Sequence, residues 1–318
     1  MDVMRRRGIF YSLMALALLL PISAFALYSA MHAQESGASA VTEVVGRETS
    51  NFAESIELDF PRALSIAGRT SLTAAVNHIV SSGIAADDAQ LRVRELAWNG
   101  TYYEIPSALM SNNSLSEWTS RLESKGGAYG LNVTATVTNV TVFPYDSFHL
   151  LFSANMSLKA RSDAYQMNLT RSLSAEALVG FDGIEDPLYP LNTNGLVDRV
   201  IAENSTGVYG VDALDDFFNQ REYLPSSQGA SFLDRLEGNP LLSTRYASMT
   251  ARVAGMESLV DLSQLLAQGV DIEENSTVVD YLYFNATTPA GWRVEGSAYP
   301  LLILDNVSAS EFGVGLVG

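Results

Sequence analysis

The chain begins with a long apolar segment. Arg5, Arg6 and Arg7 are followed by 24 residues without a charge, from Gly8 to Met31. A helix of that length, at about 1.5 Å per residue, covers about 36 Å, enough to cross a hydrocarbon core of about 30 Å. The arginines precede the segment, so the positive-inside rule predicts a cytoplasmic N-terminus and an external remainder. We therefore predict a cytoplasmic tip and membrane anchor over residues 1–33, with the bilayer crossed by residues 8–31.

Processing of this segment has two alternatives. Ala24-Phe25-Ala26 offers a signal-peptidase site of the A-x-A type. Arg7-Gly8-Ile9 resembles the junction that archaeal prepilin peptidases cut, which makes Gly8 and Ile9 a candidate processing site, although Leu13 stands where many pilins carry an acidic residue. Retention of the anchor is favoured because the apolar run continues past Ala26 to Met31.

Helical periodicity follows the anchor. Residues 34–48 are small and polar, typical of a linker or a frayed helix extension. From residue 50 to 82 apolar side chains recur at helical spacing and form one stripe with Phe52, Ile56, Phe60, Ala63 and Ala67. Pro61 is expected to kink or divide this helix, and Gly83 to end it. We interpret residues 34–84 as a linker and a stalk helix that also packs on the next domain.

A second helix is indicated by a capping pattern. Ser114 and Glu117 have the spacing of a capping box, in which each side chain bonds the other residue's amide. Leu115, Trp118 and Leu122 would share one face, and Gly126-Gly127 would close the helix.

Residues 131–179 predict a three-stranded antiparallel meander. In the second strand Phe148, Leu150, Phe152 and Ala154 alternate with polar residues, and the third strand repeats this pattern. The first strand changes phase near Thr138, which a β-bulge would explain. Arg171 falls on the apolar row of the third strand and needs a partner or an edge position.

After residue 182 the pattern becomes less regular. Helices are expected near 211–222, 231–237 and 256–268, and strands at 277–285, 291–295 and 299–305. The predicted fold class is α+β: an N-terminal transmembrane helix and helical stalk, an antiparallel-sheet domain with packed helices at 85–183, and a second α+β region at 184–318.

The composition excludes several kinds of site and partner. The 318 residues include no cysteine, which excludes disulfides, thiolate metal sites and cysteine nucleophiles. The net charge is −17. Such an acidic chain repels nucleic acid, so no nucleic-acid partner is expected.

Acceptor sequences for N-glycosylation are in excess. Ten Asn-x-Ser/Thr sequons occur where about three are expected by chance, and all lie beyond the anchor. Their positions on the predicted outer side favour glycosylation. The acceptors are Asn99, Asn112, Asn132, Asn139, Asn155, Asn168, Asn204, Asn275, Asn285 and Asn306.

Catalytic signatures were not found. His32, His78 and His149 are not spaced as metal ligands, and no nucleophile-elbow, P-loop or zincin motif occurs. Asp182, Glu185 and Asp186, with Asn192 and Asn194, form a weak calcium candidate, although turn-forming polar groups are the favoured reading. We predict no cofactor and no enzymatic activity.

Several segments resemble a known family. EDPLYPLNTNG (Glu185 to Gly195), SFLDRLEG (Ser231 to Gly238) and VDYLYF (Val279 to Phe284) are similar to an uncharacterised family of archaeal membrane-anchored surface proteins. The resemblance implies a surface location in an archaeon and carries no established activity, so it assigns no catalytic residue. The N-terminus bears a weaker resemblance to archaeal type IV pilin-like proteins.

These observations support two functional hypotheses. The first is a single-pass, N-glycosylated surface protein with a structural or interaction role, of pilin-like layout, whose partners are the bilayer and envelope or pilus proteins. The alternative is a membrane-tethered ligand-binding ectodomain or extracellular hydrolase. A concave pocket with convergent carboxylates would favour the alternative.

Overall fold

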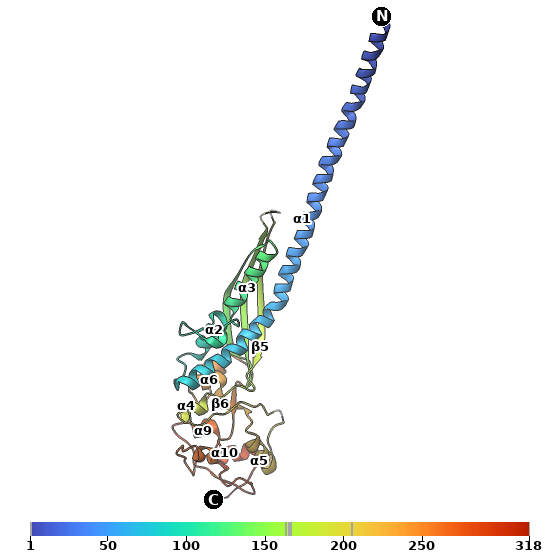
Figure 1. Ribbon diagram of the computed structural model, residues 1–318. Helices are drawn as coiled ribbons and strands as arrows, with labels where there is room; N and C mark the ends of the chain where they lie inside the picture. The colour runs from blue at the N-terminus through green and yellow to red at the C-terminus, as the bar shows by residue number, and fades with distance from the viewer. Residues whose placement is uncertain (1, 163, 165–166, 205, 318) are drawn as a thin grey trace.

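One helix runs through the N-terminal quarter of the chain. The computed structural model describes the backbone of residues 2–162, 164, 167–204 and 206–317, and in the first helix it describes side chains from residue 43 onward and at Ser23. Helix α1 spans Asp2–Ser82 without a break at residues 34–48 or at Pro61. Of the two alternatives for residues 34–48, the helix extension is therefore found and the linker is not, and Pro61 does not divide the helix. Gly83, at φ +68°, ends it as predicted. In Figure 1 the first part of α1 extends well beyond the remaining elements.

The predicted meander is confirmed. Strands β3 (Asn132–Pro144), β4 (His149–Ser162) and β5 (Met167–Gly180) form an antiparallel sheet in the order β3-β4-β5. The register shifts between Val137 and Asn139, which places a bulge at Thr138. The alternating apolar side chains of β4, including Phe152 at 0% exposure, face the core.

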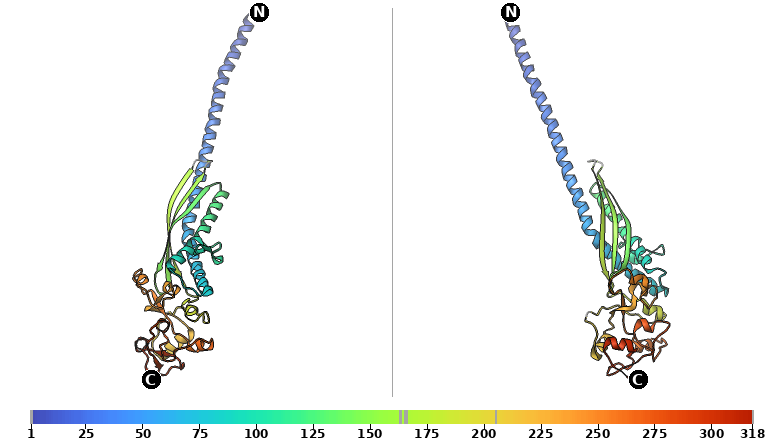
Figure 2. Two further views of the ribbon diagram at one scale, coloured as in Figure 1. Left: turned by 90° about the vertical axis from the view of Figure 1, so that its left-hand side faces the viewer. Right: turned by 180° about the vertical axis from the view of Figure 1, so that it is seen from behind.

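Helices cover only the apolar face of this sheet. Helix α1 packs on β5 and β4, whereas α3 (Leu115–Ala128) and α2 (Ala89–Asn99) pack on β3. Phe60 of α1 stacks on Trp118 of α3 with ring centroids 5.4 Å apart. Figure 2 shows the helices on one side of the sheet and the other side open.

The capped helix differs in detail from the prediction. The Ser114 hydroxyl accepts the Glu117 amide at 3.3 Å, so the N-cap is confirmed. Glu117 does not complete the box, because its Oε2 is buried with no hydrogen-bond partner among the described residues. Gly126 and Gly127 do not close α3, which continues to Ala128. A Cβ on Gly126 would lie 2.2 Å from Val133 Cγ2, so this glycine allows close packing of the helix on β3.

Arg171 has both of the arrangements expected for it. It lies on β5, an edge strand, and its Nη1 is 3.2 Å from Glu57 Oε2 of α1. Its position on the apolar row is therefore compensated by an ion pair with the helix that covers that row.

Short elements make up the C-terminal region, where one prediction is confirmed only in part and another is wrong. Residues 256–268 contain a strand and a short helix, and 280–283 form a helical turn in place of the expected strand. Its helices are α4 (Leu188–Asn192), α5 (Val211–Gln220), α6 (Phe232–Leu236), α7 (Thr244–Ala247), α8 (Leu262–Ala267), α9 (Asp280–Tyr283) and α10 (Asn306–Phe312). Its strands are β6 (Leu224–Ser231), β7 (Gly255–Glu257), β8 (Trp292–Val294), β9 (Ile303–Leu304) and β10 (Leu316–Val317).

Two apolar cores fill the molecule. The larger one lies between the sheet and its helices and also takes in α6, where Phe232 stacks on Phe181 with ring centroids 4.4 Å apart. The smaller one lies among α5, α8, α10 and the sheet β10-β8-β9. Between α2 and α3 the chain forms a small hairpin, β1 (Thr101–Tyr102) with β2 (Ile105–Pro106), and the 3₁₀ turn η1 (Ala108–Met110).

Candidate functional site

Four predicted glycan acceptors share the open face of the sheet. Asn132, Asn139, Asn155 and Asn168 are all exposed. Asn139 and Asn155 are directly opposed across β3 and β4, and Arg161 separates Asn132 from Asn168 in a second row. The bulge at Thr138 produces this arrangement, because without it Asn139 would face the core.

The other six acceptors lie outside this sheet. Asn99, Asn112, Asn275 and Asn306 are exposed, whereas Asn204 and Asn285 are half-buried. The amide of Asn204 is engaged, because its Nδ2 donates to Glu222 Oε2 at 2.5 Å. None of the ten is buried, so their geometry is compatible with modification, which stays a prediction.

The predicted anchor lies mostly outside the described side chains. Among the side chains that the structure describes, no helix is sufficiently long and apolar to span a bilayer. Residues 8–31, apart from Ser23, and the candidate processing site at Gly8 and Ile9 fall outside that set. The anchor and its processing therefore stay predictions.

The calcium candidate is not supported by the positions of its residues. Asp186 is fully buried and pairs with Arg235, whereas Asp182 is exposed and its Oδ1 accepts the Glu203 amide. Over the described part of the chain, no three histidine or acidic side chains come together as a metal site. An arginine already neutralises the one carboxylate that points inward, so we do not carry this hypothesis further.

A buried charge network occupies the place where we expected a turn and a strand. Arg235 of α6 donates through Nη1 to Asp186 Oδ2 at 2.5 Å and through Nη2 to Asp280 Oδ2 at 2.9 Å. All three side chains are fully buried. The Tyr223 hydroxyl also donates to Asp186, at 2.8 Å. These contacts join α6, α9 and the segment after β5.

A second buried arginine extends this network. Arg199 donates to the Tyr189 hydroxyl at 3.1 Å and to the Leu259 carbonyl. Burial raises the pKa of Tyr189 to about 12. Two arginines and two aspartates thus balance their charges out of contact with water. Solvent cannot reach Asp186 or Asp280, so the network holds the fold rather than presenting groups to a substrate.

Sequence reasoning missed this network, although two signals for it exist. Asp280 is the single charge in the apolar run Val278 to Leu282. Ser231 and Asp234 form a complete capping box that begins α6 and orients Arg235. The sequence therefore contains two indications of a buried ion pair: the charge of Asp280 inside an apolar run, and Arg235 directly after the cap of α6.

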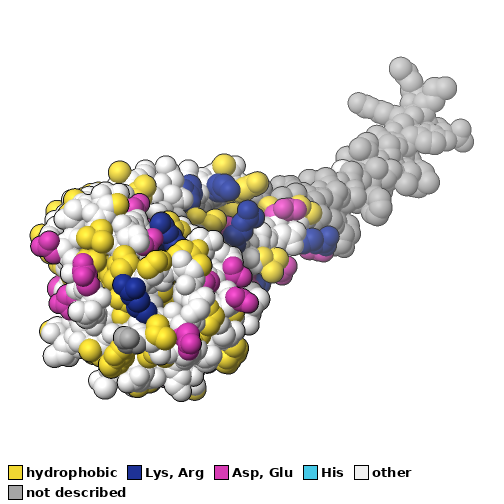
Figure 3. Space-filling view, turned by 90° about the horizontal axis from the view of Figure 1, so that it is seen from below, with side chains coloured by type: hydrophobic (Ala, Val, Ile, Leu, Met, Phe, Trp, Pro, Cys, Tyr) yellow, Lys and Arg dark blue, Asp and Glu magenta, His cyan; other side chains and the backbone are white. Residues whose placement is uncertain are grey.

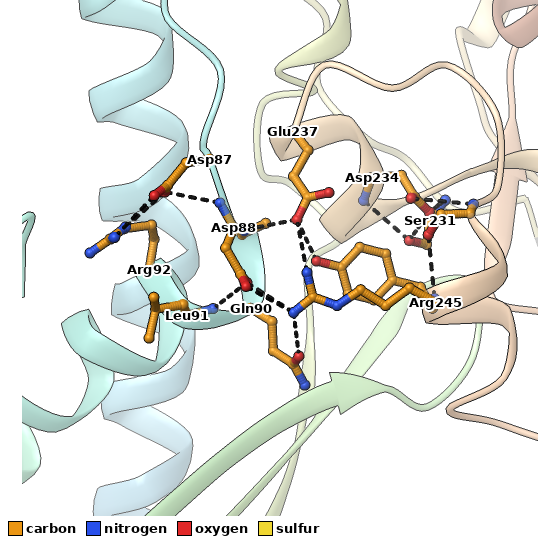
Figure 4. Close-up of polar contacts among 12 residues, drawn as sticks. Asp87, Asp88, Gln90, Leu91, Arg92, Ser231, Asp234, Glu237 and Arg245 are labelled. Atoms are coloured by element: carbon orange, nitrogen blue, oxygen red, sulfur yellow. Dashed lines mark hydrogen bonds and ion pairs between the residues drawn. The ribbon is translucent and has the colours of Figure 1, made fainter.

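Exposed polar contacts connect the sheet domain to the C-terminal region. Figure 4 shows the Arg245 guanidinium beside Asp88, Gln90 and Glu237. Its Nη2 lies 3.0 Å from both carboxylate oxygens of Asp88. Glu237 also accepts the Ala89 amide at 2.9 Å, so the two regions meet through specific bonds as well as the shared core.

A surface cavity between α1 and α3 carries basic side chains. It has a volume of about 310 Å³ and is lined by Arg62, Arg121 and Lys125, with one acid, Asp59. Asp59 accepts the Trp118 indole N–H at 3.1 Å. In a chain with 36 acidic and 19 basic residues, three cations at one cavity can bind an anionic group.

The pKa of one carboxyl group lies well above its usual value. Burial raises the pKa of Glu257, on β7, to about 7. Its exposed fraction is 8%, so it lies away from solvent rather than in an open pocket. This carboxyl therefore does not supply one member of the accessible pair of acids that most glycoside hydrolases use.

Comparisons with known proteins add no assignment. No family model, curated protein or solved structure matches this chain.

Proposed function

We propose that the protein is a single-pass, membrane-anchored and N-glycosylated surface protein with a structural or interaction role. The observation that carries this proposal is the difference between the two faces of the sheet β3-β4-β5. Helices cover one face, whereas the other holds four exposed acceptor asparagines and, within the described part of the chain, no helix. A glycan needs such exposure, and an open polar face covered by glycans would be protected from other proteins.

The layout of α1 supports the same proposal. Its apolar first part precedes a C-terminal part that packs on an antiparallel sheet. This is also the layout of pilin-like proteins, and that comparison is an analogy at the level of the fold. The anchor, the external location and the assembly into an envelope structure are parts of the proposal.

A ligand-binding ectodomain is the second candidate. It is favoured by the cavity with Arg62, Arg121 and Lys125 between α1 and α3. A continuous helix at about 1.5 Å per residue would hold residue 59 about 40 Å from residue 31, which is too far for contact with a lipid headgroup. A ligand of this cavity would therefore be a soluble or envelope-derived anion.

Protease accessibility tests the proposed topology. Protease added to spheroplasts should degrade residues 34–318 while a cytoplasmic marker stays intact. Full protection of the C-terminal region would refute the external location.

Intact mass of the membrane-extracted protein tests the anchor and the glycans together. We expect a mature N-terminus at or before Ile9 and a mass increase from several glycans. An N-terminus at Leu27 would show signal-peptidase cleavage, and an unmodified mass would refute glycosylation.

A further inference from the structure

The C-terminal end of the molecule has a cavity beside an exposed tryptophan. The cavity has a volume of about 450 Å³ and is lined by Trp292, Arg293, Glu274, Asn275 and Val317, among others. Trp292 is 40% exposed, unusual for the largest apolar side chain. Figure 3 views the molecule from this end and shows exposed hydrophobic side chains among separate acidic and basic groups.

The backbone holds a glycan acceptor next to this tryptophan. The Gly291 amide donates to the Asn275 carbonyl at 2.8 Å, and Ser276 forms a β-bridge with Ala290. A Cβ on Gly291 would lie 2.5 Å from Ile303 Cγ2 and 3.0 Å from the Thr277 nitrogen, so only glycine allows the two segments to approach this closely. Asn275 is therefore fixed beside the residue that precedes Trp292.

The folded protein has room for a glycan on the Asn275 side chain. This side chain is exposed, and no hydrogen bond to its amide occurs among the described residues. Asn204 differs, because its Nδ2 is bonded to Glu222. Arg293 and Glu274 are exposed at the same cavity. Arg293 can donate to sugar hydroxyl or carboxylate groups, and Glu274 can accept from sugar hydroxyl groups.

We propose that the glycan attached to Asn275 folds back onto Trp292 and fills this cavity with its first sugar units. The inference rests on the proposed N-glycosylation and adds a specific docking site to it. The C–H face of a pyranose is apolar and stacks on an indole ring, while Arg293 and Glu274 bond its edge. The cavity volume lies near the lower end of the usual range for ligand sites, about 300–1,000 Å³.

The order of events follows from the third residue of the sequon. Thr277 is fully buried in the folded protein, so its hydroxyl cannot be recognised there. Transfer from a glycosyl phosphate donor must therefore precede folding of this corner. In that step the Asn275 Nδ2 forms a bond to the sugar C1 while the bond from C1 to the phosphate oxygen breaks. The phosphate leaves with that oxygen and the bonding electron pair, and it takes up the proton that Nδ2 loses.

Site-specific mass spectrometry and tryptophan quenching test this docking on the full-length protein from its native membrane. Glycopeptide analysis should find Asn275 occupied. Asn275→Gln should increase acrylamide quenching of tryptophan fluorescence, because the glycan no longer shields Trp292. Asn306→Gln, which removes an exposed acceptor on α10, is the matched control and should leave quenching unchanged.

Thermal unfolding gives an independent measure. Asn275→Gln should lower Tm by about 1–4 °C, the size expected for the loss of one stacking contact. In a Trp292→Ala background the same substitution should have no further effect, because the glycan has lost its stacking partner.

The outcomes separate the two proposals. An occupied Asn275 with unchanged quenching and Tm in Asn275→Gln would overturn the docking and leave glycosylation intact. An unoccupied Asn275 beside occupied sheet acceptors would also overturn the docking alone. Absence of sugar at all ten acceptors would overturn both proposals.

Discussion

The sheet domain and the C-terminal region are stabilised in different ways. The sheet has three strands of 13, 14 and 14 residues, and its apolar face packs under long helices. The C-terminal region has strands of two to eight residues and a fully buried network of arginine and aspartate. One region relies on area buried by a repeating pattern, whereas the other combines a smaller apolar core with a few polar contacts between distant segments.

This difference shows what local pattern can specify. In an alternating strand the sequence alone identifies the residues that face the core, because side chains of successive residues point to opposite sides. The buried charges depend on partners 49 and 45 residues away from Arg235, so no local window contains the information. The following predictions test whether the two regions differ in this way.

Arg235→Met should have the largest effect. It leaves Asp186 and Asp280 buried without the cation that bonds both of them, which typically costs about 3–5 kcal/mol. We expect this loss in the free energy of unfolding from urea denaturation of the detergent-extracted protein, followed by tryptophan fluorescence. Arg245→Met is the control, because Arg245 is 42% exposed on its side chain and its pair with Asp88 should contribute less than about 1 kcal/mol. Equal losses in the two variants would show that the buried network has no special role.

Phe152→Ala tests the sheet domain. Phe152 is fully buried under α1, where a Cβ on Gly68 would lie 3.1 Å from its ring. Emptying this site should cost about 3–5 kcal/mol. Ser153→Ala changes the next residue, on the open face, and should cost less than about 0.5 kcal/mol. Similar costs for the two substitutions would contradict the register of β4.

Glu257 should make the stability of the C-terminal region depend on pH. Burial raises its folded pKa from 4.5 to about 7, so the folded state binds this proton more tightly than the unfolded state. The stabilisation is complete below the unfolded pKa and is lost as pH rises through the folded pKa. Between about pH 5 and pH 8, ionisation of Glu257 should lower the free energy of unfolding by up to about 3 kcal/mol.

Thermal unfolding across this pH range measures the effect. The Tm of the wild type should fall as pH rises, and Glu257→Gln, which cannot ionise, should flatten the curve. A slope that persists unchanged in Glu257→Gln would assign the pH dependence to other groups.

The meander of the sheet domain and the start of α3 could be predicted from sequence, whereas α2 and the β1-β2 hairpin were not predicted. Alternation located the three strands, and the phase change near Thr138 located the bulge. Ser114 was identified as a cap from its capping-box spacing to Glu117. Gly126 and Gly127 were misread because sequence shows the absence of a side chain but not whether a turn or a close contact requires it.

The C-terminal region was harder to predict for a physical reason. Val278, Val279 and Tyr281 have strand propensity, yet Asp280 turns inward to Arg235 and begins a helical turn. Tertiary contacts override propensity in such short segments. The candidate acceptors were readable as sequons, but the proximity of Asn275 to Trp292 depends on the bond between Asn275 and Gly291.

The two adjacent glycines of α3 provide the finest test of the sheet domain. Both lie inside the helix, so replacing either with alanine removes backbone entropy from the unfolded chain and should stabilise the helix by about 0.5–1 kcal/mol if space allows. Space exists at Gly127, where a Cβ would have no neighbour within 4 Å. At Gly126 the same atom would overlap Val133 of β3, and such overpacking costs about 1–3 kcal/mol. Urea denaturation should therefore show Gly127→Ala above the wild type and Gly126→Ala below it. If both variants were stabilised, α3 would not pack on β3 as closely as described, and Gly126 would have no packing role.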